Sequence, residues 1–432
     1  MHGAAEAAFG EIAARFNAEQ SAVHVALENK GDAETAVAGG LAAFAAKNAP
    51  DLLLVPDDLT PRMLSAKGTV KPLAEVLQLV NSPDFKFFIP ATVTFMKDAK
   101  GQLYGFPLLA SVPVFFYNKN AYVKAGLDPE MPPRTWHDLQ VQLLKLMRPE
   151  TEIACGYTTS DLTWVHIENL AAIHGQSIAT KNNGLDGPGA QLVFNDLLHV
   201  RHTALMESWI KSELFSYSGH QKEGDLRFAS GECATLTSAS SALGDLLKSA
   251  KFEIGVAPVP FYEEGAASPF NALVGGSSLW VLGGKKPAEY KAIAQFLAFL
   301  STPVIAAQWH QKTGTLPLTD AARIASEKSA LYERISGFGA VMRQMTANTI
   351  PSPASRGIRL PQYEKVRDVI NAELEEVWAD RKPPKKGLDD AVRIGNALIR
   401  GTPLVETKAA ARRPTVFKLA APKKKSALRA HP

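Results

Sequence analysis

The start of the chain alternates between helical and extended hydrophobic patterns. Phe9, Ile12 and Phe16 recur at helical spacing, which predicts an amphipathic helix over residues 4–18. The apolar run 23–27 then predicts a strand.

A second helix and a second strand follow at short spacing. Asp32 is placed to cap an alanine-rich helix that reaches Lys47, and the apolar run 51–55 is typical of strands buried on both faces of a parallel sheet. This alternation predicts an α/β fold, in which ligands bind outside the carboxyl ends of strands. Asp57 occupies such a position.

The stretch 109–139 centres on a strand. Residues 112–117 are apolar and predict that strand, Asn118 begins a turn into a short helix, and Thr135 opens another helix after a proline-rich connection. Because the chain is built differently on either side, we interpret the strand as a crossing between two lobes. Ser111, just before it, is predicted to line a ligand cleft.

The rest of the chain is mostly helical, with three further predicted strands. These lie at 232–237, 252–258 and 279–282. A serine-rich turn at 238–241 precedes a helix, which favours an anion site but equally fits N-capping by serine. Gly275 and Gly276 either let a backbone approach a ligand or shape a turn.

Length and composition are those of a globular protein with two domains. The 432 residues exceed what one hydrophobic core supports, and 46% hydrophobic with 21% charged residues is an ordinary composition. No window approaches 18 uninterrupted apolar residues, so we predict no membrane span.

The net charge of +4 comes from the C-terminal tail. Residues 407–432 hold eight of the 47 basic residues and no acidic ones, which leaves 39 basic and 43 acidic residues elsewhere. The tail has little apolar periodicity, and we interpret it as a disordered, solvated terminus. The alternative is contact with nucleic acid or anionic lipid; we predict no nucleic-acid partner.

Cys155 and Cys233 are the only cysteines, and neither lies in a CxxC pattern. The sequence fits a disulfide in an oxidising compartment and equally fits two unrelated buried thiols. The residues after Met1 lack the basic and apolar regions of a signal peptide, which taken literally favours the cytoplasm.

No motif points to catalysis, a metal or a cofactor. Walker A, GxGxxG, HExxH, GxSxG and EF-hand patterns are absent. Two groups of ionisable residues fit solvated helix faces better than a metal site or an acid–base pair: Asp196, His199 and His202, and Glu373, Glu375 and Glu376. We therefore predict a protein that is not an enzyme and has no catalytic residues, metal or cofactor.

Several stretches match the pattern of one known family. They are 113–139, 181–184 with Asp186 and Gly187, 251–252, Gly275 and Gly276 with 278–280, 309–314, and 373–378. Together they resemble the sn-glycerol-3-phosphate-binding proteins of bacterial ABC importers. The similarity runs with few gaps from about residue 3 to 400 and is weakest before Gly101.

The resemblance implies a periplasmic-binding-protein fold, in which two α/β lobes joined by a multi-strand hinge enclose an interlobe ligand cleft. On this chain the N-terminal lobe would take 1–112 and 262–314, and the C-terminal lobe 113–261 and 315–406. It also implies a periplasmic, monomeric protein that docks on ABC permease subunits with an ATPase and is thereby peripheral to the inner membrane.

The resemblance changes the interpretation of Met1. Family members are secreted and begin with a strand ending in an aromatic-His-x-Met sequence, and Met1 falls where that final Met would be. Our hypothesis is that the true start lies upstream, so that the given chain lacks a signal peptide and its first strand. Without that inner strand, neighbouring backbone groups would be unpaired and the chain is expected to fold poorly.

Carried over residue by residue, the resemblance keeps the phosphate-holding half of the family's site. Ser111, Gly276 and Arg367 stand where the family has the same residue types. An arginine fork suits phosphate oxygens, and a serine hydroxyl and backbone N–H groups add hydrogen bonds. Asp57 keeps the carboxylate of a family Glu on a shorter side chain.

The glycerol-holding half differs from the family. The changes are Ala33 and Thr315 for two tyrosines, Asp161 for a tryptophan near the retained Trp164, and Ala239, beside Ser240, for a serine. Losing these rings enlarges the cleft, and Asp161 adds a negative charge. We therefore expect a phosphate ester with a cationic end, such as glycerophosphocholine or glycerophosphoethanolamine, to bind at least as well as glycerol 3-phosphate.

Three other interpretations remain open from the sequence. A sugar-binding protein of an ABC importer shares the architecture but would want more stacking aromatic residues. A phosphodiester-processing enzyme would need a metal cluster or a nucleophile–base pair. A cytoplasmic scaffold acting through the basic tail requires Met1 to be the true start.

Overall fold

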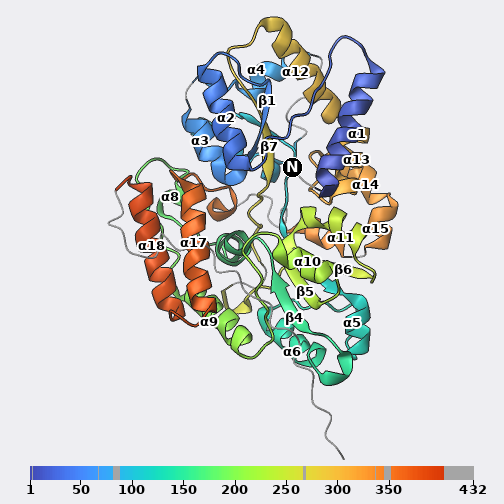
Figure 1. The fold of residues 1–432 in the computed structure, drawn as a ribbon, viewed down its shortest axis with the longest axis vertical. Coiled ribbons are helices and arrows are strands. Elements are labelled where there is room, and N and C mark those ends of the chain that lie inside the picture. Colours follow the sequence, from blue (N-terminus) through green and yellow to red (C-terminus); the bar gives the residue numbers. More distant parts are fainter. Residues whose placement is uncertain are drawn as a thin grey trace, which may run out of the picture.

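The computed structural model consists of an upper and a lower lobe (Figure 1). It describes residues 1, 3–66, 68–80, 88–265, 269–335, 337–344 and 352–402. The predicted basic tail, 407–432, lies outside the described residues. Two separate sheets and two large hydrophobic clusters confirm the predicted α/β, two-lobe architecture.

The upper lobe is built on a three-stranded antiparallel sheet in the order β1–β7–β2. The central strand β7 is covered by helices, and Trp280 and Val281 are fully buried. The strands are β1 Leu52–Pro56, β2 Gly105–Pro107 and β7 Ser277–Val281; the helices are α1 Gly3–Glu19, α2 Ala33–Ala45, α3 Thr60–Ser65, α4 Leu73–Leu77, α12 Pro287–Leu300 and α13 Pro303–Thr313.

The lower lobe is built on a four-stranded mixed sheet in the order β4–β5–β3–β6. β3 is antiparallel to β5 and β6, whereas β4 and β5 are parallel, so their carboxyl ends share one edge. The strands are β3 Pro113–Asn118, β4 Cys155–Thr159, β5 Cys233–Ala239 and β6 Ile254–Pro258; the helices that precede β6 are α5 Lys119–Lys124, α6 Trp136–Leu146, α7 Leu170–Ile173, α8 Thr180–Asn183, α9 Leu197–Lys211, α10 Glu223–Ala229 and α11 Leu243–Ser249.

The C-terminal part of the described chain adds helices to the flanks of the molecule. α17 and α18 pack against each other and against α9, with α17 beginning beside the upper lobe (Figure 1). These helices are α14 Asp320–Glu327, α15 Ala330–Arg334, α16 Phe338–Arg343, α17 Tyr363–Trp378 and α18 Pro384–Ile399. No single described helix has the length and apolar composition of a membrane span. Helices α12 and α13, which are bent against each other, have that length and composition only when they are counted as one.

Four chain segments lie side by side where the lobes meet. Backbone bonds join Ser111 and Gly275 in both directions (3.0 Å each), Ser240 to Val112 (2.8 Å) and Leu316 to Ala110 (2.7 Å). Since these segments belong to parts of the chain far apart in sequence, they form the multi-strand junction that the sequence predicted. The exact lobe boundaries stay a prediction.

The strand predictions need correction at four places. Residues 23–27 are not a strand in the structure, because the side-chain amide of Asn17 takes the place of a neighbouring strand and bonds both the N–H and the carbonyl of Val25. β1 pairs antiparallel with β7 rather than lying within a parallel sheet. The pattern also missed β2, which has only three residues, and β4, whose five residues include small Gly156 and no aliphatic run.

A buried disulfide joins β4 and β5. Cys155 and Cys233 face each other in the strand register and are almost inaccessible to solvent. The structure thus decides between the two interpretations that the sequence left open. Because the bridge spans a sequence separation of 78 residues, it restricts the unfolded chain strongly.

Replacing both cysteines, as Cys155→Ala with Cys233→Ala, should lower the free energy of unfolding by about 2–5 kcal/mol. The loss is expected because the unfolded chain regains entropy. Urea unfolding of the oxidised wild type and the double variant measures it. Equal midpoints, or two titratable thiols in unreduced, denatured wild type, would contradict the assignment.

Candidate ligand-binding site

The candidate site centres on the guanidinium of Arg367, which joins the two lobes. Nε and Nη2 donate to the carboxylate of Glu168 at 2.6 and 2.8 Å, and Nη2 also donates to Asp57 Oδ2 at 2.6 Å. Nη1 makes only longer contacts, 3.5 Å to Asp57 and 3.6 Å to Asp58. Arg367 therefore ties α17 to the segment after β1, and Nη1 is its least engaged arm.

Local backbone structure brings Asp57 and Arg367 together. Asp57 follows β1 directly, and its N–H donates to the carbonyl of Gly276 at 2.8 Å. Arg367 lies four residues after Tyr363 on α17, so its guanidinium stacks over that ring at 5.3 Å from the centroid. The end of β1 thus holds Asp57 from the upper lobe, and the start of α17 holds Arg367 from the lower lobe.

A π-helical turn supplies two further side chains. This turn, Trp164–Asn169, carries Trp164 and Glu168, and such turns occur frequently at functional sites. The hydroxyl of Tyr363 donates to Glu168 Oε1 at 2.7 Å. Glu168 is thereby fixed for its bidentate contact with Arg367.

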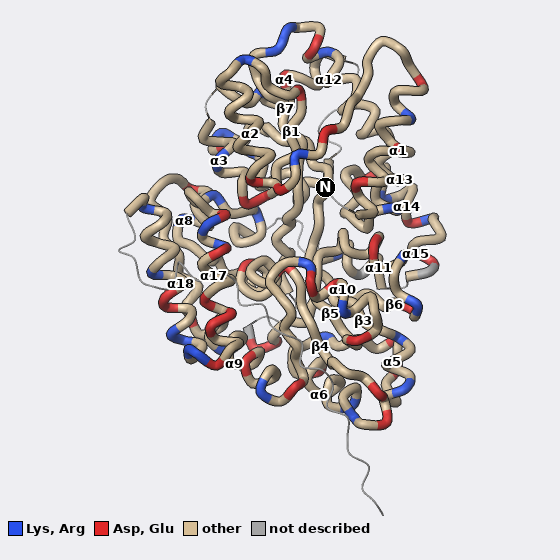
Figure 2. The backbone as a smooth tube through the Cα atoms, viewed as in Figure 1, with Lys and Arg blue, Asp and Glu red and all other residues tan. Residues whose placement is uncertain are grey.

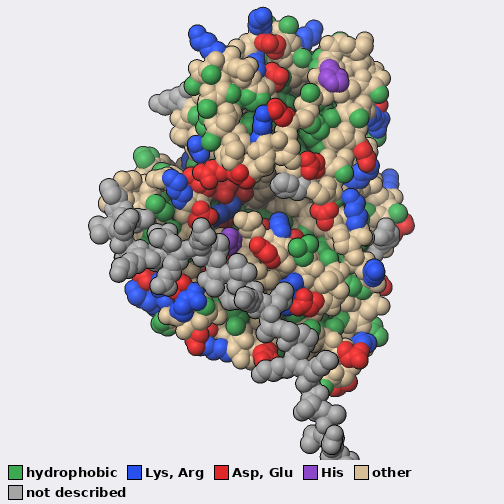
Figure 3. Space-filling view, in the orientation of Figure 1, with side chains coloured by type: hydrophobic (Ala, Val, Ile, Leu, Met, Phe, Trp, Pro, Cys, Tyr) green, Lys and Arg blue, Asp and Glu red, His purple; other side chains and the backbone are tan. Residues whose placement is uncertain are grey.

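Carboxylates outnumber cations in this cluster. Burial alone would lower the pKa of Arg367, but Asp57 and Glu168 outweigh burial and hold that pKa well above its ordinary value. Burial raises the pKa of Asp58 to about 6, with Arg367 opposing and Asp57 adding to the rise. Figure 2 shows acidic positions on both sides of the gap between α3 and α17, and Figure 3 shows acidic side chains gathered at one end of the recess between the lobes.

A neutral half of the site lies at the lobe junction. Ser111 is 2% exposed, and its hydroxyl has no hydrogen-bond partner among the described residues. The indole N–H of Trp164, whose ring lies against Gly275, is likewise unpaired within the described chain. Since buried polar groups are normally bonded, these two are available to a ligand.

Gly276 is required by backbone geometry. Its φ is +112°, and a Cβ at this position would lie 1.8 Å from the carbonyl oxygen of Leu109. No other residue fits so close a backbone approach. Gly276 therefore connects the two halves, because it lies beside the Ser111 junction and accepts the N–H of Asp57.

Ser240 and Thr315 are fully buried at the same junction. The hydroxyl of Ser240 accepts a hydrogen bond from the N–H of Val112 at 3.4 Å, and that of Thr315 bonds Thr313 at 2.8 Å. Their side chains thus stabilise the junction, and their contact with ligand stays a prediction.

Asp161 and Ala33 lie outside the Arg367 cluster. Asp161 follows β4 with a φ of +52° and forms an ion pair with Lys222. The unopposed negative charge expected from the sequence is therefore offset. Ala33 is exposed at the first position of α2.

Sequence reasoning missed the residues that surround Arg367 and Asp161. Glu168 lies in no motif, and nothing in the sequence indicates a π-helical turn. Lys222 is 61 residues from its partner Asp161. Tyr363 carried the one usable signal, since an aromatic residue four positions before an arginine predicts stacking on a helix.

The two groups interpreted as solvated helix faces are partly buried. His199 and His202 are 0% and 1% exposed; Asp196 caps α9, and His202 bonds His166 at 2.8 Å. The solvated-face prediction is therefore wrong for the two histidines, whose side of α9 packs into the lower lobe. Within the described ranges, no group of three ligands could hold a metal ion.

The acidic group on α17 needs the same correction. Glu373 is buried beside Lys382. Glu375 accepts hydrogen bonds from Tyr217 at 2.7 Å and His220 at 2.9 Å. These carboxylates face protein partners because α17 packs against neighbours on more than one side.

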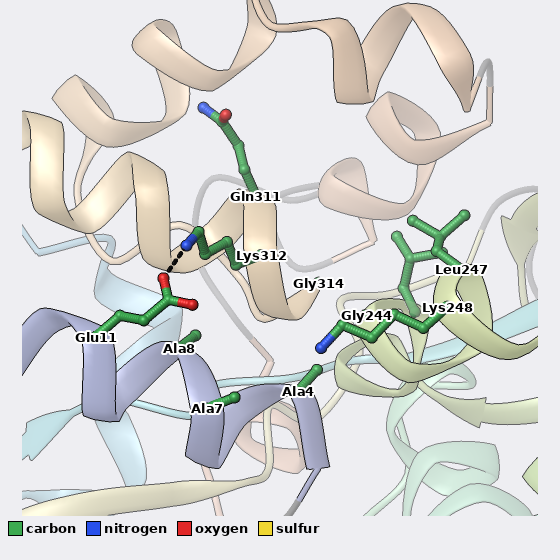
Figure 4. A pocket seen from close by; sticks show the side chains of 11 residues that line it. Ala4, Ala7, Ala8, Glu11, Gly244, Leu247, Lys248, Gln311, Lys312 and Gly314 are labelled. Carbon is green, nitrogen blue, oxygen red and sulfur yellow. Dashed lines mark hydrogen bonds and ion pairs between the residues drawn. The ribbon is translucent and has the colours of Figure 1, made fainter.

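A separate cavity of about 370 Å³ lies between α1, α11 and α13 (Figure 4). It is lined partly by alanines and glycines, and by Glu11, Lys312 and Lys248, of which Glu11 and Lys312 pair with each other. None of its lining residues belongs to the Arg367 and Ser111 site.

Comparison with known proteins gives consistent matches. Residues 11–333 match a family described as bacterial extracellular solute-binding protein. The sn-glycerol-3-phosphate-binding periplasmic protein UgpB of Pectobacterium atrosepticum is 41% identical over 90% of this chain and 87% of its own length, and that of Escherichia coli K12 is 40% identical over 90% and 88%. The crystal structure of UgpB from Mycobacterium tuberculosis in complex with glycerophosphocholine shares the fold, with a TM-score of 0.75, 22% identity, and coverage of 91% of this chain and 95% of that one.

Glu168→Gln should lower the free energy of unfolding by at least about 2 kcal/mol, because a buried guanidinium loses a charged partner. Urea unfolding measures the loss. Glu19→Gln is the matched control, since it breaks an exposed arginine pair and should cost about 0.5 kcal/mol or less. An equal effect of the two variants would contradict the cluster's importance.

Asp58→Asn should stabilise the protein at pH 7.5, and the gain should shrink as pH falls towards 4.5. The folded-state pKa of Asp58, about 6, lies above the ordinary 3.8, so the folded protein binds the proton more tightly and wild-type stability falls as pH rises through this window. Urea midpoints of both proteins at the two pH values test this. A difference that is independent of pH would count against it.

Proposed function

The chain belongs to the family of bacterial extracellular solute-binding proteins, and from this premise we propose that it captures sn-glycerol 3-phosphate and glycerophosphodiesters for an ABC importer. The resemblance seen in the sequence is thereby confirmed. The observation that carries the ligand assignment is a largely buried arginine between the two lobes, in a chain whose relatives are named for sn-glycerol 3-phosphate.

The proposed phosphate position lies between Arg367 and the lobe junction. Nη1 of Arg367 has the weakest contacts of the guanidinium and can turn to a phosphate oxygen. The unpaired hydroxyl of Ser111 and the backbone around Gly276 complete the site. Charge-assisted bonds of this kind are strong and directional.

The remaining predicted contacts surround the rest of the ligand. In this proposal Asp57 accepts hydrogen bonds from glycerol hydroxyls once a phosphate shares Arg367, and Ser240, Thr315, Asp161 and Ala33 are the further contacts. The extension from monoester to diester rests on the small side chains that Ala33 and Thr315 have where the family has tyrosines.

Binding then acts on the relative position of the lobes. Asp57 belongs to the upper lobe, whereas Arg367 and Glu168 belong to the lower one. A phosphate that binds Arg367 and Ser111 together favours the closed arrangement, which the permease recognises. The cost is competition with Asp57 for the guanidinium.

The proposed function implies where the protein acts and which partners it contacts. It acts in the periplasm as a monomer and meets the inner membrane through permease subunits with their ATPase. Relatives are named as binding proteins, and we assign no catalytic step to this chain. Their names favour a phosphate ester over the sugar alternative.

Arg367→Ala should weaken sn-glycerol 3-phosphate binding roughly 30-fold or more, as expected when one partner of a buried charge pair is removed. Isothermal titration calorimetry at pH 7.5 measures the affinity. Arg381→Ala, which removes an exposed arginine three residues after the end of α17, is the matched control and should change affinity less than about twofold.

Ser111→Ala provides a second variant that should fold normally, because its hydroxyl has no partner in the described structure. Affinity is expected to fall while the free energy of unfolding stays the same or rises. If both Ser111→Ala and Arg367→Ala bound sn-glycerol 3-phosphate with wild-type affinity, the assignment of the phosphate to this site would be wrong. No binding to the wild type would overturn the proposed function itself.

A further inference from the structure

Asp58 lies beside the arm of Arg367 that the proposed phosphate uses. It belongs to the short 3-10 turn η1 Asp57–Leu59, which follows β1 and packs against α17. Oδ2 of Asp58 lies 3.6 Å from Nη1 of Arg367, and the side chain is 24% exposed. A phosphate oxygen that binds Nη1 therefore comes to lie next to the Asp58 carboxyl.

Asp58 has the fewest hydrogen bonds of the three carboxyls around the guanidinium. Its Oδ1 is buried without a partner among the described residues. Asp57, by contrast, accepts from Nη2 of Arg367 at 2.6 Å, and Glu168 accepts from Nε and from the hydroxyl of Tyr363. Because a buried carboxylate oxygen without a donor is costly, the neutral acid is the form that suits the position of Asp58 best.

The cluster already holds more negative than positive charge. One guanidinium faces Asp57, Asp58 and Glu168, so the net charge is −2 when all three carboxyls are ionised. Glu364, on the first turn of α17, adds to the negative potential at Asp58. A bound phosphate ester adds at least one further negative charge, which a neighbouring carboxylate repels. A proton taken up by one carboxyl would leave the net charge of a site with a bound diester unchanged.

The surroundings of Asp58 favour its protonation. Burial raises the pKa of Asp58 to about 6; Arg367 opposes this rise, and the other carboxyls of the cluster and Glu364 add to it. Arg62 is the one charged residue of the adjoining helix α3, and it forms no ion pair with Asp58 within the described ranges. An anion bound beside Asp58 raises the pKa further, because it disfavours the charged form.

We propose that Asp58 takes up a proton when the phosphate ester binds, and that its Oδ2 then donates a hydrogen bond to the phosphate oxygen held by Nη1 of Arg367. The proposal rests on the proposed function and deepens it, since it states how the site recognises the anion. The proton comes from solvent and forms the O–H bond on Oδ2. Oδ1 becomes the carbonyl oxygen of a neutral acid. Hydrogen bonds from O–H donors to anionic oxygens are short and strong.

The two proposed ligand classes differ in the source of this proton. A phosphate monoester has a second pKa of about 6 and can bring the proton itself. A phosphodiester such as glycerophosphocholine has no group that titrates near neutral pH, so the proton has to come from solvent. Proton uptake on binding of the diester therefore reports the protein alone.

Calorimetric titration with glycerophosphocholine at pH 7.5, in HEPES and in Tris, measures this uptake, because the ionisation enthalpies of the two buffers differ. A pKa of about 6 leaves Asp58 almost fully ionised in the free protein at this pH, so the wild type should take up about one proton per ligand. Its affinity should also rise roughly five- to tenfold between pH 7.5 and 6.5.

Three variants separate the roles of charge and hydrogen bond. Asp58→Asn keeps a donor without the charge, so it should take up no proton and bind at least as tightly as the wild type at pH 7.5. Asp58→Ala should also take up no proton, but it lacks the donor and should bind roughly fivefold or more weakly than Asp58→Asn. Asp320→Asn, a matched change at an exposed carboxylate of α14, should keep the wild-type uptake. Melting curves show whether each variant is folded.

The inference can fail while the proposed function stands. Binding of the diester to the wild type without proton uptake, or an uptake that persists in Asp58→Asn, would overturn the protonation of Asp58. Equal affinities of Asp58→Ala and Asp58→Asn would overturn its hydrogen bond to phosphate. If only sn-glycerol 3-phosphate binds, the same measurements at pH 8.5, where the monoester is a dianion, decide. Failure of the wild type to bind either compound would overturn the proposed function and this inference together.

Discussion

A buried guanidinium has to be neutralised where it lies, and in this protein the carboxylates that neutralise Arg367 come from both lobes. Glu168 holds it within the lower lobe, and Asp57 holds it from the upper lobe. How completely the charge of this one side chain is compensated thus depends on how the lobes are placed. Each supporting feature (the end of β1, the first turn of α17 and the π-helical turn) serves to bring one member of this cluster into contact.

The lobe junction supplies neutral polar groups beside the ion cluster around Arg367. Backbone bonds between Ser111 and Gly275 and the close approach at Gly276 leave no room for other side chains. The polar groups that point away from these bonds, the Ser111 hydroxyl and the Trp164 indole, are left unpaired. Arg367 can share its charge with a ligand, and the Ser111 hydroxyl and the Trp164 indole N–H have no partner among the described residues. These groups together suit the proposed small anionic ester.

The sequence predicted the fold class and one side of the site for identifiable reasons. Asp57 was predicted because an apolar strand stops just before it, and Ser111, Gly276 and Arg367 because the family that the chain resembles has the same residue types at these positions. Glu168 and Lys222 were not predicted, since each acquires its role from a partner distant in the chain. The same limit explains the errors at 23–27 and at β4, where a local pattern cannot report which neighbouring segment satisfies the backbone.

The central claim is that the Asp57–Arg367 contact couples the lobes, and an interlobe distance tests it most directly. Spin labels at exposed positions on each lobe, through Asn48→Cys and Ser208→Cys, would report the distance distribution by pulsed electron spin resonance. The account predicts that Asp57→Asn shifts the ligand-free distribution to longer and broader distances, and that saturating sn-glycerol 3-phosphate restores the shorter one. Ligand-free distributions that superimpose for the wild type and Asp57→Asn would contradict it.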